Sequence, residues 1–132
     1  MLDRLSAAVR MAQRVRLVLV EAPVGLGVPR IACARTLAPL QGSVVALAGW
    51  FAPEVASHLR GSSALAIVVW DQATGSGFEI TGTTESLQEY GECSAFDLGS
   101  ARGRPTRAEA ELRVRVEKIV AFGAEEALTA GA

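Results

Sequence analysis

The sequence predicts a mainly β fold, a six-stranded antiparallel β-barrel with an N-terminal helix and one short helix in the middle of the chain. Short segments rich in β-branched residues are separated by turns that contain Gly and Pro. Two of these segments are apolar at nearly every position, so both of their faces must be covered. Few helical segments are available to cover them, which favours a barrel over a sheet layered with helices.

Composition and charge restrict the classes of protein to which the chain can belong. Its 132 residues, 50% of them hydrophobic, suffice for one core, so we expect a single domain over residues 1–132. Thirteen basic residues balance 14 acidic ones, so we expect neither a nucleic-acid nor a membrane partner. Arginines interrupt the first apolar residues, so we expect no signal peptide. Cys33 and Cys93 lie far apart without a CxxC motif, which predicts reduced thiols and a cytoplasmic location.

The N-terminal third predicts a helix followed by three strands. Leu2, Leu5, Val9 and Ala12 recur at helical spacing with arginines between them, which predicts an amphipathic helix over residues 1–14. The barrel is then expected over residues 15–122. Its first three predicted strands are Val15–Ala22, Arg30–Leu37 and Ser43–Gly49, separated by turns with Gly or Pro.

The centre of the chain predicts a short helix and a hairpin. Pro53 suits a first helical position, so a helix is predicted over Pro53–Arg60. Ala64–Asp71 is the most strongly β-like segment. The turn Thr74–Gly77 then returns the chain along a fifth strand, Phe78–Leu87.

The last third predicts a loop, a final strand and a tail. Gln88–Arg107 is rich in Gly, Ser and charged residues and is predicted to be a loop. Glu111–Phe122 alternates apolar with charged residues, as a strand with one buried face does. The expected apolar face consists of Leu112, Val114, Val116, Val120 and Phe122. Residues 123–132 are predicted to be a loose tail.

The two most apolar strands also predict a partner. If Ser43–Gly49 and Ala64–Asp71 fill a barrel interior with one face, their other face needs cover. A second copy of the chain would provide that cover. We therefore expect a symmetric homodimer.

Several short motifs, in their order and spacing, resemble those of a known family. They are Gly27-Val28-Pro29-Arg30, Gly49-Trp50-Phe51-Ala52-Pro53, His58-Leu59-Arg60, Val69-Trp70-Asp71, Thr74 to Gly82 and Val114 to Ile119. Together they resemble the FMN-binding, pyridoxamine 5'-phosphate oxidase-like proteins, in particular the short single-domain members. The resemblance implies a split β-barrel homodimer with flavin sites in clefts between the subunits. It further implies oxidation or reduction of a small molecule, with deazaflavin or haem replacing FMN in some relatives.

The resemblance also implies which residues bind the cofactor. It places Ala48, Gly49 and Trp50 along the isoalloxazine ring, where a glycine permits close approach and an indole offers a stacking surface. A second interpretation, equally open, is that Trp50 and Phe51 are core aromatics of a dimer.

The start of the middle helix departs from the family pattern. Relatives begin this helix with hydroxyl or basic residues that bind the flavin phosphate, whereas this chain has Pro53, Glu54 and Val55. The free amide groups of a helix start suit a phosphate, but Glu54 adds an opposing negative charge. Arg35 and Thr36, where relatives often carry a phosphate ligand, are the predicted substitutes, although Arg35 is also open to interpretation as a surface arginine. The predicted cofactor-binding residues are therefore Arg35, Thr36, Ala48, Gly49, Trp50 and Val55.

More than one class of function remains open. The first is an FMN-dependent oxidoreductase of a small molecule, with no catalytic residue assigned. The second is a non-enzymatic dimeric binding module for flavin, deazaflavin or haem, or a structural dimer that has lost FMN. His58 is the only histidine, so no histidine metal cluster is expected, and His58 is interpreted as a helix-end residue. Arg102, Arg104 and Arg107 form a basic cluster that is either solvated or faces an anion.

Overall fold

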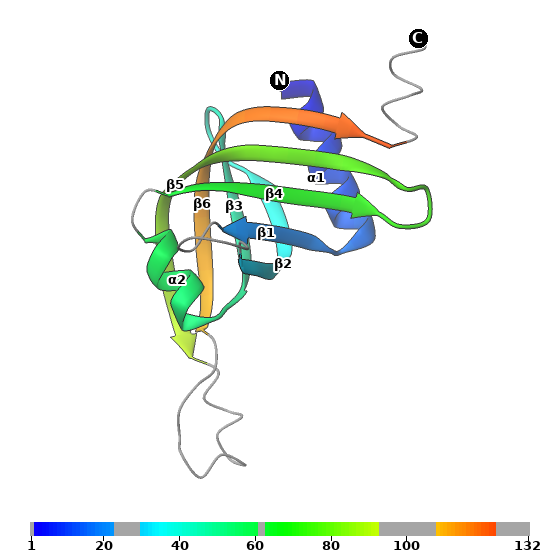
Figure 1. The fold of residues 1–132 in the computed structure, drawn as a ribbon. Coiled ribbons are helices and arrows are strands. Elements are labelled where there is room, and N and C mark those ends of the chain that lie inside the picture. The colour runs from blue at the N-terminus through cyan, green and yellow to red at the C-terminus, as the bar shows by residue number, and fades with distance from the viewer. Residues whose placement is uncertain (1, 23–29, 61–62, 93–107, 124–132) are drawn as a thin grey trace.

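The computed structural model describes residues 2–22, 30–60, 63–92 and 108–123, and in it six antiparallel strands close into a barrel (Figure 1). The strands are β1 Val18–Ala22, β2 Arg30–Pro39, β3 Val44–Phe51, β4 Ala64–Asp71, β5 Ser76–Glu92 and β6 Ala108–Phe122. Their order around the barrel is β1-β2-β3-β6-β5-β4, and β4 pairs with β1 to close it. The helices are α1 Leu2–Val15 and α2 Pro53–Leu59. The predicted fold class is confirmed, while the predicted tail from residue 124 lies outside the described residues.

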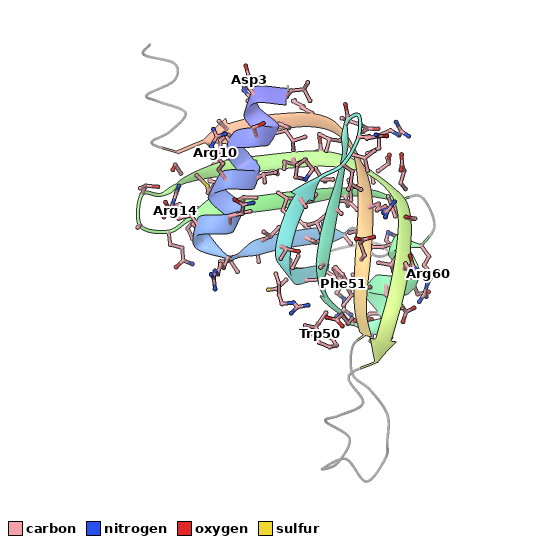
Figure 2. The ribbon with its side chains drawn as sticks, turned by 180° about the vertical axis from the view of Figure 1, so that it is seen from behind. Asp3, Arg10, Arg14, Trp50, Phe51 and Arg60 are labelled. Atoms are coloured by element: carbon pink, nitrogen blue, oxygen red, sulfur yellow. The ribbon has the colours of Figure 1, made fainter. Side chains whose placement is uncertain are left out.

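The barrel interior is the core, because alternate side chains of every strand point into it. The largest fully buried side chains include Phe51, Leu47, Leu59, Ile67, Ile80 and Leu112. Helix α1 adds Leu5, Val9 and Met11 to the same core. Helix α1 packs mainly against β2 and β4, and Figure 2, which shows the barrel from behind, has it in front of the strands. The apolar face predicted for this amphipathic helix therefore covers the barrel.

Arg14 and Asp71 tie the end of α1 to the end of β4. Arg14 Nη2 lies 2.9 Å from Asp71 Oδ2, and the Asp71 side chain is only 12% exposed. The other carboxylate oxygen of Asp71 accepts a hydrogen bond from the Ala73 backbone N–H at 3.0 Å. The hydrogen bond from Arg14 lowers the pKa of Asp71, and this effect outweighs the desolvation that raises it. The Asp71 carboxylate therefore holds the end of α1 against the barrel and also contacts the backbone of the β4–β5 turn.

The substitution Asp71→Asn should remove part of the pH dependence of stability in acid. Because the pKa of Asp71 is lowered in the folded state, its contribution is complete above the ordinary aspartate pKa of about 4 and is lost as the pH falls through the lowered value. Urea unfolding followed between about pH 7 and pH 2 should show a shallower loss of stability in the variant than in the wild type. Identical slopes in the variant and in the wild type would contradict this role for Asp71.

Several strand ends differ from the prediction. Helix α1 continues through Val15, so the prediction that the first strand starts there was wrong; the helical spacing of the preceding turns carries on to this residue. Strands β2 and β3 run on to Pro39 and Phe51 because each continues to pair with its neighbours there. In consequence Trp50 and Phe51 belong to β3 and point to opposite faces of the sheet.

The prediction that Gln88–Arg107 is a loop was wrong for its first part. Gln88–Glu92 continues β5 and pairs with the start of β6, although its composition is typical of a loop. Cross-strand hydrogen bonds decide the conformation here, because β propensity depends on the neighbouring strand more than on local sequence. The basic cluster of Arg102, Arg104 and Arg107 lies outside the described residues.

A β-bulge changes which residues of β6 face the core. Glu117 is an extra residue without a register partner on β5. An extra residue reverses the alternation of side chains beyond it. Ile119 is accordingly buried, whereas Val120 and Phe122 are partly exposed. The predicted apolar face was therefore correct up to Val116 and wrong beyond it.

Strands β3 and β4, whose apolar character predicts a second copy of the chain, stand on opposite sides of the barrel. In the cyclic strand order β3 lies between β2 and β6, and β4 lies between β1 and β5. The outward side chain of Trp70 on β4 is 37% exposed, and that of Trp50 on β3 is half-buried. A single flat partner can cover one of these two outer faces. Neither described helix is both long and apolar enough to cross a membrane.

Candidate functional site

The candidate site is built on β2, where a β-bulge interrupts the pairing with β3. Ala34 pairs with Gly49 and Thr36 pairs with Ala48, so Arg35 is the extra residue. A bulge breaks the alternation of side chains between the two faces of a sheet. Arg35 and Thr36 are accordingly both exposed, although strict alternation would turn one of them into the core. The two residues predicted to bind a phosphate thus lie together on the outer surface.

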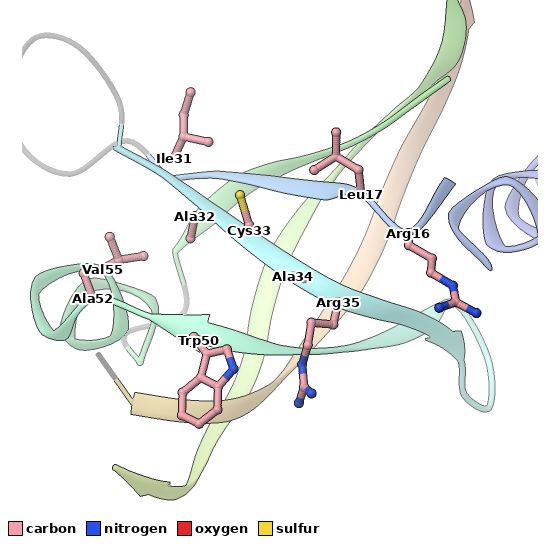
Figure 3. A pocket seen from close by; sticks show the side chains of 10 residues that line it. All are labelled: Arg16, Leu17, Ile31, Ala32, Cys33, Ala34, Arg35, Trp50, Ala52 and Val55. Atoms are coloured by element: carbon pink, nitrogen blue, oxygen red, sulfur yellow. The ribbon is translucent and has the colours of Figure 1, made fainter. Parts of the chain in front are cut away.

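A hollow of about 460 Å³ lies over β2, between the end of α1 and the start of α2 (Figure 3). It is lined by Arg16, Leu17, Ile31, Ala32, Cys33, Ala34, Arg35, Trp50, Ala52 and Val55. We call it the tryptophan hollow. Figure 3 shows the side chains of Arg16 and Arg35 at one end and those of Ala52 and Val55 at the other. Its volume lies in the range of small-molecule sites, and its wall is apolar with two cations at one end.

A second hollow of about 610 Å³ adjoins the first between α1 and β2. It is lined by Ala12, Gln13, Arg16, Arg35, Thr36, Leu37 and Ala38. We call it the helix hollow. Arg16 and Arg35 line both hollows, so these two residues form a wall that the hollows share.

Arg35 is held by a carboxylate and an aromatic ring. Its Nη2 lies 2.6 Å from Oε2 of Glu109 on β6, and its guanidinium carbon lies 6.0 Å from the centroid of the Trp50 ring. The Arg35 side chain is 58% exposed, so the ion pair contributes only about 0–1 kcal/mol to stability. Its effect is positional: the guanidinium is kept beside the indole, where the cation and the ring attract each other.

Arg16 is a lining residue that the sequence analysis missed. It follows α1 directly, and it is the one non-glycine residue with positive φ in the described ranges, at 56°. Its backbone N–H donates to the Ala12 carbonyl at 2.9 Å. Its guanidinium has no hydrogen-bond or ion-pair partner among the described residues, unlike that of Arg35. No sequence signal identifies it, because only the turn from α1 into β1 brings it to the hollows.

The start of α2 carries an ion pair. Ala52 is the N-cap and makes no side-chain capping hydrogen bond, and Pro53 follows it in the first turn. Glu54 Oε1 lies 2.9 Å from Arg30 Nη1 on β2, so the negative charge at this helix start has a cationic partner. Val55 is 3% exposed and packs into the core from the edge of the tryptophan hollow.

The close packing of two strands explains why residue 49 is a glycine. A Cβ at this position would lie 2.8 Å from Ala34 Cα and 2.9 Å from the Cys33 carbonyl oxygen. Only glycine therefore lets β2 and β3 approach this closely at the bulge. Gly49 is buried, and Ala48 is half-buried on the outer face of β3. Neither residue is among those that line the tryptophan hollow.

The structure brings most of the predicted residues together. Arg35, Trp50 and Val55 line the tryptophan hollow, and Thr36 lines the adjoining helix hollow. The outward apolar row of β2 was missed, namely Ile31, which is 61% exposed, and Cys33, a free thiol. These two residues alternate with Arg35 along the strand, so the period of two that marks one face of a strand was the signal available.

Neither His58 nor a cluster of metal-ligating residues contributes to the tryptophan hollow. In the part of the chain that the structure describes, no three His, Cys, Asp or Glu side chains are grouped as a metal site would need. His58 lies in the last turn of α2, and its carbonyl accepts a hydrogen bond from Ser63 Oγ at 2.9 Å. The predicted position at a helix end is confirmed. Cys93, the second cysteine, lies outside the described residues.

Comparison with solved structures identifies the fold. No protein-family model matches the sequence, and no curated protein matches it either. HupZ of Group A Streptococcus superposes with a TM-score of 0.63 and 18% identity, over 90% of this chain and 94% of that one. A pyridoxamine 5'-phosphate oxidase-related, FMN binding protein of Nostoc punctiforme superposes with a TM-score of 0.62 and 10% identity, over 93% of this chain and 83% of that one. The chain has the fold of the pyridoxamine 5'-phosphate oxidase-like proteins.

The same fold also occurs in a reductase. An F420 reductase superposes with a TM-score of 0.53 and 14% identity, over 79% of this chain and 88% of that one. The resemblance inferred from the sequence motifs is thus confirmed at the level of the fold. Fold alone does not determine chemistry, so function has to be argued from the site.

Proposed function

We propose that the protein binds FMN in the tryptophan hollow and acts as a flavin-dependent oxidoreductase of a small molecule, with deazaflavin as the alternative cofactor. The observation that carries the proposal is the hollow itself, in which an indole and an apolar strand face stand beside two guanidinium groups. That combination suits a planar ring with an anionic group attached. Proteins of the same fold include an FMN binding protein and an F420 reductase, which supports this class of ligand.

Each wall of the hollow has a separate part in this proposal. Trp50 and Ile31 would contact the ring and exclude water from one of its faces. Arg35, held beside Trp50, would donate hydrogen bonds to anionic oxygens. A bound flavin supplies hydride or electron transfer, and the protein binds and orients it.

A second candidate function is non-enzymatic carriage of flavin or haem. Among the described residues, those that line the tryptophan hollow include no His, Asp, Glu, Lys or Tyr, and an arginine side chain does not release its proton at neutral pH. The scarcity of acid and base groups favours carriage of a cofactor over a reaction that needs proton transfer from the protein.

Titration with FMN tests the binding proposal. The protein should quench flavin fluorescence at one FMN per chain, and Trp50→Ala should weaken binding about fivefold, because loss of an aromatic contact costs on the order of 1 kcal/mol. Trp70→Ala is the matched control, since Trp70 lies on β4 and does not line the hollow. Absence of FMN binding, or equal effects of the two substitutions, would overturn the proposal. A Soret band in the purified protein would favour haem instead.

Reduction separates the two candidate functions. FMN-loaded protein that is reduced by a nicotinamide cofactor and reoxidised in air, repeatedly and with wild-type occupancy, behaves as an oxidoreductase. Flavin that stays oxidised under the same conditions indicates carriage.

We also propose a cytoplasmic homodimer formed through the outer face of β3 and β6. Small side chains keep this face flat along β3, at Ala46 and Ala48, and it borders the tryptophan hollow at Trp50. A second copy seated there would narrow the hollow into a cleft between subunits. Cys33 is a free thiol, in keeping with a reducing compartment.

The charges of β6 favour a dimer interface on the outer face of β3 and β6 over one on the outer face of β4. In the part of β6 before the bulge at Glu117, the outward residues are Glu109, Glu111, Arg113 and Arg115, an acidic half followed by a basic half. A twofold axis across the middle of β6 would set the acidic half of one copy against the basic half of the other. Such an interface is self-complementary in charge.

A further inference from the structure

The wall between the two hollows holds two arginines whose charges are differently compensated. Arg35 has the carboxylate of Glu109 at 2.6 Å, so much of its positive charge is already balanced. Arg16 has no such partner among the described residues, although its side chain lines both hollows. Within the described part of the chain, the positive charge that no carboxylate balances at the candidate site is therefore that of Arg16.

The described residues that line the helix hollow include hydrogen-bond donors and no Asp or Glu. The polar residues among its lining are Arg16, Arg35, Gln13 and Thr36, whose side chains end in guanidinium, amide and hydroxyl groups. The other lining residues are Ala and Leu. Glu109 pairs with Arg35 but does not line the helix hollow itself. A set of charged and neutral donors suits an oxyanion, and guanidinium matches phosphate geometry with two parallel hydrogen bonds.

Two backbone irregularities bring residues of this hollow to the outer surface beside α1. The bulge at Arg35 exposes Thr36 as well, so two adjacent residues of β2 reach the surface. The positive φ of Arg16 turns the chain sharply after α1, and a residue in this conformation is unfavourable unless its surroundings hold it. The alternative place for a phosphate, the start of α2, is occupied by the ion pair of Glu54 and Arg30.

We propose that the helix hollow is an oxyanion site that takes the phosphate group of a small molecule, with Arg16 as its principal binding residue and Gln13 and Thr36 as neutral donors. Placing the planar part of that molecule in the tryptophan hollow rests on the proposed function; the oxyanion site itself does not. The phosphate has two possible sources, the cofactor's own phosphate or that of a second molecule bound beside it. The two sources are distinguished by the tests below.

The first test compares FMN with riboflavin, which lacks the phosphate. Arg16→Asn removes the charge and keeps a residue that tolerates positive φ. It should weaken FMN binding at least tenfold, change riboflavin binding less than twofold, and reduce the salt dependence of FMN affinity. Arg16→Lys should recover part of the loss. The control is Arg10→Gln, on the exposed face of α1 and outside both hollows, and it should change neither affinity.

The second test uses inorganic pyrophosphate without any flavin. Its titration should shift the backbone amide resonances of Gln13, Arg16 and Thr36 with saturation, and Arg16→Asn should abolish the saturable shift. Repeating the titration on FMN-loaded protein assigns the source. Blocked pyrophosphate binding means that the site holds the cofactor's phosphate, and retained binding means that it holds the phosphate of a second molecule.

The outcomes separate this inference from the proposed function. FMN binding and pyrophosphate shifts that are both unchanged by Arg16→Asn would overturn the oxyanion site and leave the flavin proposal standing. A protein that binds no flavin but shows pyrophosphate shifts dependent on Arg16 would overturn the flavin proposal and support the oxyanion site. Absence of both kinds of binding would overturn both.

Discussion

Replacing Phe51 with alanine is expected to lower the free energy of unfolding by about 3–5 kcal/mol. Phe51 is the last residue of β3, is 0% exposed and belongs to the core of the barrel. Removal of its ring loses apolar burial and leaves a cavity that six paired strands cannot close by moving together. Urea unfolding of the wild type and of the variant measures the difference.

The neighbouring Trp50→Ala substitution is the matched control. Trp50 points to the outer face and is half-buried, so its loss should cost clearly less stability than that of Phe51. Equal losses for the two variants would show that the core does not depend on Phe51 as its burial implies. The interpretation of both residues as dimer-core aromatics was wrong for Phe51, which packs inside its own barrel.

Reversing the charge of Arg113 and Arg115 together to Glu should weaken the proposed homodimer about 100-fold or more. Each reversed residue would meet an acidic residue of the second copy, and the twofold axis repeats the contact. Like charges opposed across an interface cost several kcal/mol. Sedimentation velocity over a concentration series at micromolar protein should show a wild-type dimer and a monomeric variant.

The folding of the variant needs its own control. Arg113 pairs with Glu111 and Arg115 pairs with Glu85, but both arginines are about half or more exposed, so the monomer should lose little stability. Arg10→Glu, on α1, should sediment as the wild type does. A wild-type monomer at micromolar concentration would overturn the homodimer. A dimer that resists these reversals but is broken by Val68→Arg would put the interface on β4.

The candidate site shows which of its residues sequence patterns can predict and which they cannot. Arg35 and Trp50 were predicted, and they lie together because β2 and β3 are neighbours. Gly49 was predicted as a ligand-facing residue, but its lack of a side chain is required by the backbone of β2. Arg16 was not predicted, because its neighbours in sequence are helical and its neighbours in space belong to another element.

The strand boundaries show the same division. The β4–β5 hairpin could be predicted since Gly75, with φ of 74°, marks its turn locally. The extension of β5 through Glu92 could not, because it depends on pairing with residues of β6 that come later in the chain. The reversal of side chains after Glu117 depends on a bulge that leaves no mark in composition.

By itself, the sequence determined that the chain is mainly β with a helix at its start and a short helix in its middle, because apolar spacing and turn residues act over a few positions. Tertiary structure decided which outward residues meet. The bulge of β2 exposes Arg35 and Thr36 together, and the left-handed turn at Arg16 sets a second guanidinium beside them. Such a juxtaposition depends on hydrogen bonds between strands and on the packing of α1, and neither is encoded within any single segment.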